Sequence, residues 1–319
     1  MLPLLLPAVA AAGGEWCPRF HTIANHYDPS GPILVDGLWH VFPDGCCTSS
    51  NALGCWCHYT SPDLLRWTAQ APLSQVGNGD TGSISITSSG GPAIALFPAL
   101  VPGQHQRIED GFLRQSSLGG GLSPNVTWSP PVHVAKRPPQ LDAGFRDPAR
   151  ALLLDGSWYV GVGSGFGAGD NNTSPSKGVG CLAWMKASNA SLSAFEYAGC
   201  LLEVNSTTGS IDGKTVSWRE GDQHCAFFEC PDIFPLGDGD KYVALASVNA
   251  AQNEYFVGTI SGNKFTVEQR SLLDYGQCYA ARTGSASQSR TDRRVVFGDT
   301  GWVSQVQHEP PFALPPAKV

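Results

Sequence analysis

Three stretches of the sequence share one pattern and decide the predicted fold: Asp28–Phe42 (DPSGPILVDGLWHVF), Asp147–Val160 (DPARALLLDGSWYV) and Glu229–Val243 (ECPDIFPLGDGDKYV). Each begins with a carboxylate and a nearby proline, continues through a short apolar run, and reaches an Asp-Gly pair before an aromatic segment. Asp-Gly between two apolar runs is a hairpin signal, and proline fits the first residue of a strand. The pattern therefore predicts a β-hairpin that recurs along the chain.

Recurrence of a hairpin with an acid at one fixed place is typical of radial repetition. In a β-propeller each blade is a four-stranded sheet, and equivalent ends of the innermost strands face the central axis. Asp28, Asp147 and Glu229 would then converge in one funnel, although they lie far apart in the sequence. A chain of this length suits five blades of roughly 60 residues each. We therefore predict an all-β, five-bladed β-propeller; the alternative is that Asp-Pro and Asp-Gly are simply common turn dipeptides.

Composition agrees with an all-β fold and restricts the partner. The 319 residues include 37 Gly and 24 Pro, which oppose helix interiors, and only 15% are charged. The net charge of −7, with 20 Lys and Arg in no run, argues against nucleic acid. No apolar stretch reaches the roughly 18–20 residues needed to span a bilayer. We expect no nucleic-acid partner, no membrane span, and an uncharged small molecule as ligand.

Several features indicate a secreted protein. Residues 1–12 are almost wholly apolar and end in small residues, as in a signal peptide; a hydrophobic first strand is the alternative. Glycosylation sequons begin at Asn125, Asn171, Asn172, Asn189 and Asn205. The ten cysteines are Cys17, Cys46, Cys47, Cys55, Cys57, Cys181, Cys200, Cys225, Cys230 and Cys278. So many favour disulfides over a metal site or free thiols.

Three converging carboxylates suit acid-base chemistry. Repulsion and burial force at least one of them to hold a proton, which yields one acid and one base or nucleophile. Two such groups flanking a bond are the equipment of a glycosidase. Binding of a hard cation such as calcium is the alternative. Nearby Trp and Tyr residues suit sugar stacking better than an ion cage, so the residues alone predict a sugar-handling propeller.

At these same positions the sequence resembles glycoside hydrolase family 32, which includes invertases, inulinases, levanases and fructan hydrolases. The matching segments are Tyr27–Pro32 with Gly37–Phe42, Trp56–His58, Ser61–Trp67, Asp80–Ser83, Phe145–Pro148, Glu229–Asp232, Asp274–Ala280 and Arg293–Gly298. Each motif is weak alone, but all occur in the family's order, from about residue 20 to residue 300.

The resemblance implies a role for each of the central residues. Asp28 would be the nucleophile and Glu229 the general acid/base, with Glu229 kept protonated by burial and its acidic neighbours. Asp147 would bind fructosyl hydroxyls and stabilise the transition state, while Arg146 places it or touches Glu229. Trp56 would line the sugar pocket. The chemistry implied is retaining hydrolysis without metal or cofactor.

Five positions near the motifs depart from the family pattern. Tyr27 and Ser30 replace the two asparagines of the first motif, Asp44 stands for a glutamine, and Asp80-Thr81 stands for Phe-Ser. We assign Tyr27, Asp44, Asp80 and Thr81, with Arg146 and Trp56, to the substrate-binding set. The departures question sucrose as the preferred substrate more than they question the reaction.

The predicted organisation is a signal peptide over residues 1–12, a propeller over 13–308, and a Pro-rich tail over 309–319. The family's C-terminal β-sandwich is expected to be absent. The predicted activity is release of terminal β-D-fructofuranosyl residues from sucrose or short fructans through a covalent fructosyl-enzyme. A fructosyltransferase and a catalytically weakened fructoside-binding propeller are the alternatives. The expected location is extracellular, with the vacuole or another endomembrane lumen as the alternative.

Overall fold

The computed structural model describes most of the central part of the chain. The described residues are 28–44, 56–73, 81–100, 109–118, 122, 128–167, 178–205, 208–211, 227–237, 239–249, 252–273, 278–285 and 294–299. The predicted signal peptide, the Pro-rich tail, and Tyr27 and Asp80 lie outside these ranges. Every named element within the described part is a β-strand, which confirms the all-β prediction.

The strands form five sheets, each from consecutive segments of the chain. The first sheet contains β1 (Pro29–Val35), β2 (Leu38–Pro43), β3 (Trp56–Ser61) and β4 (Thr68–Leu73), and the second β5 (Ser83–Ile86), β6 (Ala93–Leu100), β7 (Glu109–Leu118) and β8 (Val132–Lys136). The third contains β9 (Ala143–Arg146), β10 (Leu152–Leu154), β11 (Ser157–Phe166), β12 (Val179–Ala187) and β13 (Phe195–Asn205). The fourth contains β14 (Glu229–Pro235), β15 (Lys241–Asn249), β16 (Gln252–Ser261) and β17 (Lys264–Leu272), and the fifth β18 (Tyr279–Gly284) and β19 (Val295–Asp299).

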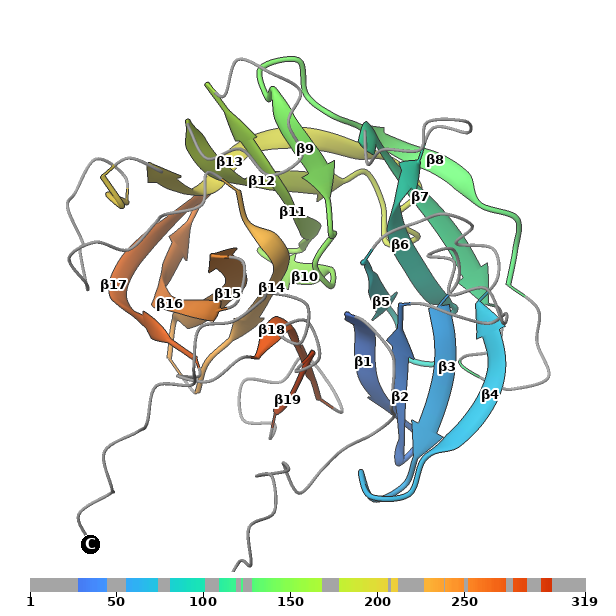
Figure 1. Ribbon diagram of the computed structural model, residues 1–319. Helices are drawn as coiled ribbons and strands as arrows, with labels where there is room; N and C mark the ends of the chain where they lie inside the picture. Colours follow the sequence, from blue (N-terminus) through green and yellow to red (C-terminus); the bar gives the residue numbers. More distant parts are fainter. Residues whose placement is uncertain are drawn as a thin grey trace, which may run out of the picture.

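The sheets follow one another around a common centre, with β1, β5, β10, β14 and β18 innermost (Figure 1). Buried apolar clusters fill the space between neighbouring sheets. Phe42, Trp56 and Phe97 pack between the first and second sheets, whereas Trp184 and Phe256 pack between the third and fourth. Burial between sheets arranged radially is the packing of a propeller. Within the described residues the fifth sheet has two strands, so five complete blades stay a prediction.

The predicted Asp-Gly hairpins are present in two of the three repeats. Asp36-Gly37 joins β1 to β2 and Asp155-Gly156 joins β10 to β11, each as a two-residue loop with both φ angles positive. Such a loop matches the right-handed twist of its strands, and Asn, Asp and Gly tolerate it best. In the third repeat Leu236 N donates to Lys241 O across a longer loop. The longer loop explains the extra residue in that repeat.

The segment 161–169 has the glycine-rich composition of a loop, but most of it lies in a strand. Gly161 to Phe166 belong to the buried strand β11. A Cβ atom on Gly163 would lie 2.1 Å from the carbonyl oxygen of Phe228. Glycine is required there because β11 touches the backbone that leads into β14. The close approach brings Glu229, at the start of β14, toward the third sheet.

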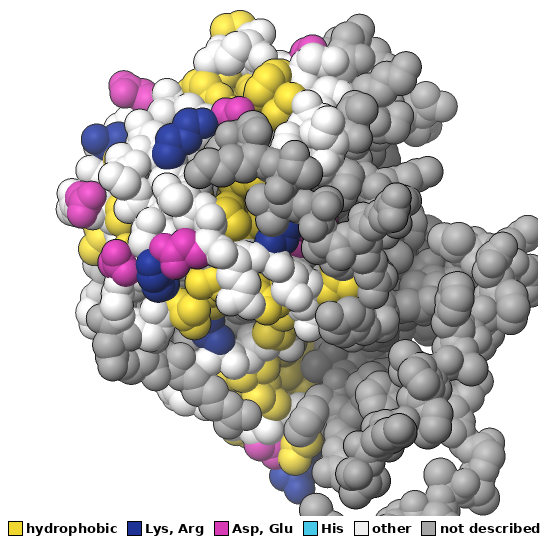
Figure 2. Space-filling view, turned by 90° about the vertical axis from the view of Figure 1, so that its left-hand side faces the viewer, with side chains coloured by type: hydrophobic (Ala, Val, Ile, Leu, Met, Phe, Trp, Pro, Cys, Tyr) yellow, Lys and Arg dark blue, Asp and Glu magenta, His cyan; other side chains and the backbone are white. Residues whose placement is uncertain are grey.

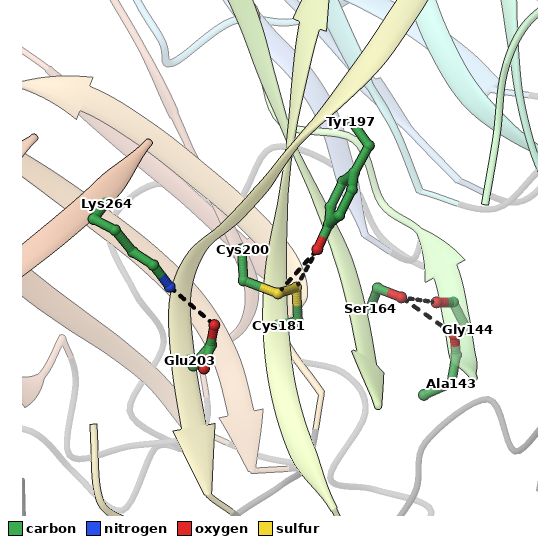
Figure 3. Close-up of a disulfide and its surroundings, with 8 residues drawn as sticks. All are labelled: Ala143, Gly144, Ser164, Cys181, Tyr197, Cys200, Glu203 and Lys264. Atoms are coloured by element: carbon green, nitrogen blue, oxygen red, sulfur yellow. Dashed lines mark hydrogen bonds and ion pairs between the residues drawn. A yellow bond between two sulfur atoms is a disulfide. The ribbon is translucent and has the colours of Figure 1, made fainter. Parts of the chain in front are cut away.

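A disulfide joins the two outer strands of the third sheet, as Figure 3 shows. Cys181 on β12 and Cys200 on β13 have Cα atoms 5.4 Å apart, and the Tyr197 hydroxyl lies 3.3 Å from Cys200 Sγ. Cys230, also among the described cysteines, is a free thiol. The expectation of disulfides is therefore confirmed for the Cys181–Cys200 pair. The residues that lie outside the described ranges are Cys17, Cys46, Cys47, Cys55 and Cys225.

Two arginines connect the innermost strands at the centre of the molecule. Arg150 donates to the carbonyls of Pro32 and Thr283, at 2.5 and 2.6 Å, and Arg282 donates to those of Asp147, Pro148 and Pro231. The buried Asp232 carboxylate accepts from Thr283 N at 2.8 Å. Hydrogen bonds from a charged group are stronger than those between neutral groups. The arginines therefore fix the ends of β1, β14 and β18 relative to one another.

The surface carries charge in small, mixed groups. On the side where β17 lies, Figure 2 shows single basic and acidic side chains among apolar and uncharged ones, with no continuous basic patch among the described residues. Lys264 Nζ pairs with Glu203 Oε1 at 2.9 Å in such a group. Exposed pairs of this kind contribute little to stability. No helix able to cross a membrane occurs within the described ranges.

A buried histidine pair in the first sheet predicts loss of stability in acid. His40 Nδ1 and His58 Nε2 are 2.9 Å apart, and the His58 ring stacks on Phe42. Burial lowers the pKa of His40 to about 4. Burial, and then the charge of the neighbouring His40, lowers the pKa of His58 to about 3. The unfolded chain binds these protons near pH 6.5, so it holds more protons than the folded chain between pH 6.5 and about 4. Stability therefore falls as the pH drops through that window.

We expect the free energy of unfolding to fall by roughly 6 kcal/mol between about pH 7 and pH 4 through this pair, about 3 kcal/mol from each histidine. His58→Gln should reduce that slope, because glutamine stays neutral. Urea denaturation at several pH values measures the slope directly. His133→Gln, on the exposed face of β8, is the matched control. An unchanged slope in His58→Gln would show that other groups cause the acid loss.

Candidate active site

The candidate site lies where the innermost strands begin. In β1, β14 and β18 the register with the neighbouring strand shifts by one residue, which is a β-bulge, and in the third sheet Asp147 lies in the break between β9 and β10. One residue at each of these four places has a left-handed backbone: Gly31 (φ 55°), Asp147 (φ 56°), Cys230 (φ 48°) and Ala280 (φ 50°). A residue other than glycine pays about 1–2 kcal/mol for this conformation. Strain of this kind clusters at functional sites.

The bulges show that the three acids do not occupy equivalent positions, so that part of the sequence prediction is wrong. Asp147 is itself the residue with the left-handed backbone, whereas Glu229 lies one residue before the bulge at Cys230. Asp28 lies three residues before the bulge at Gly31. The prolines that follow the bulges, not the acids, mark the repeat. The acids nevertheless converge, as the contacts below show.

Asp28 contacts the second sheet through a hydroxyl. Thr81 Oγ1 lies 2.6 Å from Asp28 Oδ2 and 3.1 Å from Asp44 Oδ2. Ser30 Oγ donates to Asp44 Oδ1 at 3.4 Å and accepts from Gly82 N at 3.0 Å. Asp44 and Thr81 are buried, and Asp28 is half-buried. Two of the predicted substrate-binding residues therefore touch each other and the predicted nucleophile.

The Cys230 thiol connects Asp28 to Asp147. Its Sγ lies 3.3 Å from Asp28 Oδ2 and 3.8 Å from Asp147 Oδ2, and its backbone N donates to the same Asp147 oxygen at 3.0 Å. Burial, followed by the charges of Asp28 and Asp147, raises the pKa of the thiol well above its ordinary value. Cys230 is therefore a neutral hydrogen-bond donor at the point where two carboxylates meet.

Glu229 is held by one cation and one hydroxyl. Arg146 Nη2 pairs with Glu229 Oε1, and its Nε lies 3.4 Å from Asp147 Oδ2. The Tyr279 hydroxyl donates to Glu229 Oε2 at 2.5 Å, while Phe227 stacks under the Arg146 guanidinium at 4.2 Å. Burial, and then Glu229, raises the pKa of Tyr279. Arg146 and Tyr279 thus each contact one oxygen of the Glu229 carboxyl group and fix its orientation.

The arrangement gives different environments to two carboxyl groups. Asp28 receives hydrogen bonds from neutral donors, Thr81 and Cys230, whereas Glu229 contacts Arg146 and a tyrosine whose hydroxyl can also accept a hydrogen bond. Carboxyl groups in unlike environments can divide the roles of nucleophile and acid/base. No group of three metal-ligand side chains was found within the described residues.

The family model described as "Glycosyl hydrolases family 32 N-terminal domain" matches residues 24–174 and 213–313. These ranges cover most of the chain and contain every residue of the site described above. The chain belongs to glycoside hydrolase family 32. The resemblance predicted from the motifs is thereby confirmed.

Two curated relatives illustrate how distant the family members are. The chain is 26% identical over 292 residues to a β-fructofuranosidase, insoluble isoenzyme 1, of Oryza sativa subsp. indica, covering 80% of this chain and 44% of the relative. It is 25% identical over 328 residues to a fructan 6-exohydrolase of Beta vulgaris, covering 87% of this chain and 46% of the relative. The chain thus spans about half the length of the curated relatives it matches.

Solved structures of family 32 proteins share the fold. A fructan 1-exohydrolase IIa from Cichorium intybus with 1-kestose superposes with a TM-score of 0.63 at 19% identity, over 87% of this chain and 52% of that one. A sucrose-6-phosphate hydrolase from Lactobacillus gasseri gives 0.57 at 18% identity, over 82% and 51%. Identity at this level supports the fold alone.

The family 32 site brings together most of the residues predicted from the sequence. Asp28, Asp44, Thr81, Arg146, Asp147 and Glu229 form one connected set. Trp56 is fully buried beneath it, packed on Phe97, and forms a β-bridge with Asp44. Tyr27 and Asp80 lie outside the described residues.

Sequence reasoning gave no role to Cys230 or Tyr279, although both stand in quoted motifs. The available signal was position: Tyr279 precedes the bulge of β18 as Glu229 precedes that of β14. That equivalence becomes visible only once the bulges are located.

Proposed function

We propose that the chain is the propeller module of a retaining β-fructofuranosidase. It releases terminal β-D-fructofuranosyl residues through a covalent fructosyl-enzyme, with Asp28 as nucleophile, Glu229 as acid/base and Asp147 as the group that binds the fructosyl hydroxyls. The observation that supports it most directly is the connection of the three acids: Cys230 contacts Asp28 and Asp147, and Arg146 contacts Asp147 and Glu229.

The proposed reaction has two steps. Asp28 attacks the anomeric carbon while Glu229 gives a proton to the leaving oxygen, so the glycosidic bond breaks and an ester to Asp28 forms. Water then attacks the same carbon, Glu229 takes its proton, and Asp28 leaves. The Tyr279 hydroxyl, which contacts Glu229 Oε2, can donate a hydrogen bond to the carboxylate form of Glu229 and accept one from its protonated form, so it can hold Glu229 through both steps.

Sucrose and short fructans are the proposed substrates. Relatives of the chain are a β-fructofuranosidase and a fructan 6-exohydrolase, and both names refer to fructosyl transfer to water. Asp44 and Thr81 stand where the family pattern has Gln and Ser, so the pocket differs near the nucleophile. We assign those two residues to the shell around the substrate, together with Arg146, Tyr27 and Asp80, and we assign Trp56 to the support of Asp44 beneath that shell.

We further propose five complete blades over residues 13–308, a cleaved signal over 1–12, and secretion. Family membership and the five sheets support the blade count. The Cys181–Cys200 disulfide supports an oxidising compartment, because disulfides persist there. The exposed Asn189, which begins a sequon, is available for glycosylation on that route.

The deciding experiment expresses the chain through a secretory host and measures fructose release from sucrose, inulin and levan at mildly acidic pH. We expect release from at least one of them, with the anomeric configuration of the first product retained by NMR. Fructose transfer to sucrose at high concentration would favour the transferase. Binding of sucrose by a folded protein without release would favour the fructoside-binding alternative and contradict the hydrolase.

A further inference from the structure

One hydroxyl lies between two carboxyl groups at the edge of the site. Thr81 Oγ1 is 2.6 Å from Asp28 Oδ2 and 3.1 Å from Asp44 Oδ2, both within hydrogen-bond distance. Thr81 and Asp44 are 1% and 4% exposed, so bulk water does not mediate these contacts. The proposed roles of Asp28 and Glu229 leave Asp44 without an explanation.

If both Asp28 and Asp44 are ionised, the single hydrogen of the Thr81 hydroxyl cannot fill both of its contacts. A hydroxyl carries one hydrogen and can donate it once, whereas an ionised carboxylate only accepts. Two carboxylates facing one hydroxyl would leave two buried oxygens in contact with no hydrogen between them. A second hydrogen on one of the acids removes the conflict, because the hydroxyl then accepts from that acid and donates to the other.

The surroundings identify the acid that holds the hydrogen. Asp28 Oδ2 faces two donors, Thr81 Oγ1 at 2.6 Å and Cys230 Sγ at 3.3 Å, and the shorter distance is typical of a hydroxyl donating to a carboxylate. Asp44 Oδ2 lies at the longer distance, and its other oxygen accepts from Ser30. Asp44 is also the more buried of the two, and burial favours the neutral form of a carboxyl group.

We propose that Asp44 is a neutral carboxylic acid that donates to Thr81, which in turn donates to Asp28. The hydrogen-bond relay from Asp44 through Thr81 to Asp28 then delivers one oriented hydrogen bond to the proposed nucleophile. Asp44 is a positioning residue, acting through Thr81, and not a substrate ligand alone. It supplies the donor that the amide of a glutamine would supply at this position, which explains how an acid is accommodated beside another acid.

The direct test follows the protonation of Asp44 by carbon-13 NMR in the full chain labelled at the aspartate carboxyl carbons. The Asp44 resonance is identified by its loss in Asp44→Asn. We expect it to remain in the neutral form from about pH 5 to 7, where ordinary aspartates, with pKa near 3.9, are ionised. Asp240→Asn, which removes an exposed aspartate with 80% of its side chain accessible, is the matched control. Loss of a neutral resonance in Asp28→Asn instead would overturn the proposal, as would an Asp44 resonance that is ionised at pH 6.

The kinetic test rests on the proposed function, because it takes Asp28 as the nucleophile. Asp44→Asn keeps a donor toward Thr81, so we expect kcat within about tenfold of the unchanged chain. Asp44→Ala and Thr81→Val interrupt the hydrogen-bond relay. Each should lower kcat by roughly 10- to 100-fold with a smaller change in KM, which is the scale expected for a misplaced reacting group. Thr81→Ser should recover most of the loss seen in Thr81→Val.

The two tests fail separately. A neutral Asp44 in a chain that releases no fructose would contradict the proposed function and leave this inference standing. An ionised Asp44 in an active enzyme would contradict this inference and leave the proposed function standing. Equal loss in Asp44→Asn and Asp44→Ala would show that the carboxyl group itself is needed and would contradict its role as a simple donor.

Discussion

Asp28→Asn is expected to lower kcat for fructose release by at least roughly 10⁴-fold, the scale seen when a covalent nucleophile is removed. An amide cannot form the ester that the first step requires, although it still accepts from Thr81 and Cys230 at the same oxygen position. The folded structure should therefore persist. Steady-state kinetics with sucrose or inulin, beside a thermal denaturation curve, measure both expectations.

The matched control is Asp36→Asn, at the tip of the first hairpin. Asp36 is exposed and has φ 50°, a conformation that asparagine also adopts. Its kcat should stay within about twofold of the unchanged chain. Retention of more than about a tenth of the activity by Asp28→Asn, in a preparation free of deamidated protein, would exclude Asp28 as the nucleophile.

The hairpins were predictable because their signal is local. Asp-Gly at a two-residue loop determines the turn, and the short apolar run Leu152–Leu154 coincides with β10. The same local logic failed in the glycine-rich segment. Gly163 is required by the carbonyl oxygen of Phe228, which directly precedes β14 of another sheet, so nothing nearby in the sequence marks Gly163 as part of a strand.

The residues of the site were predictable, but their positions relative to the bulges were not. Asp28, Asp147 and Glu229 were grouped by their prolines, yet they stand at three different places relative to the bulges. Asp147 and Cys230 adopt a left-handed backbone without being glycine, so no residue preference reveals the bulge. The contacts of Cys230 and Tyr279 join different sheets, and they depend on packing that sequence alone does not specify.

The position of Trp56 differs from the one that the family resemblance implies. The family resemblance assigns it to the sugar pocket, whereas the structure places its ring in the core between the first two sheets, against Phe97. Its backbone pairs with Asp44 in a β-bridge. Trp56 therefore fixes the strand end that carries Asp44, and that role follows from burial and not from the motif.

Glu229→Gln is expected to reduce kcat on sucrose by roughly 10²–10⁴-fold, because the variant cannot protonate the leaving oxygen. Its amide remains within reach of Tyr279 but loses the ion pair with Arg146. The loss should depend on the leaving group. A fructosyl donor that carries fluoride needs no proton for departure, so its first step should be nearly as fast as in the unchanged chain, while the second step stays slow.

The expected result is accumulation of a fructosyl-enzyme on Asp28, seen by mass spectrometry of the intact chain and located by peptide mapping. Glu196→Gln, an exposed position on β13, is the matched control and should accumulate nothing. Equal losses on sucrose and on the fluoride donor would show that Glu229 does not protonate the leaving group. The variant also tests whether Glu229 sets the alkaline limit of the reaction: the alkaline fall in kcat should disappear with the carboxyl group.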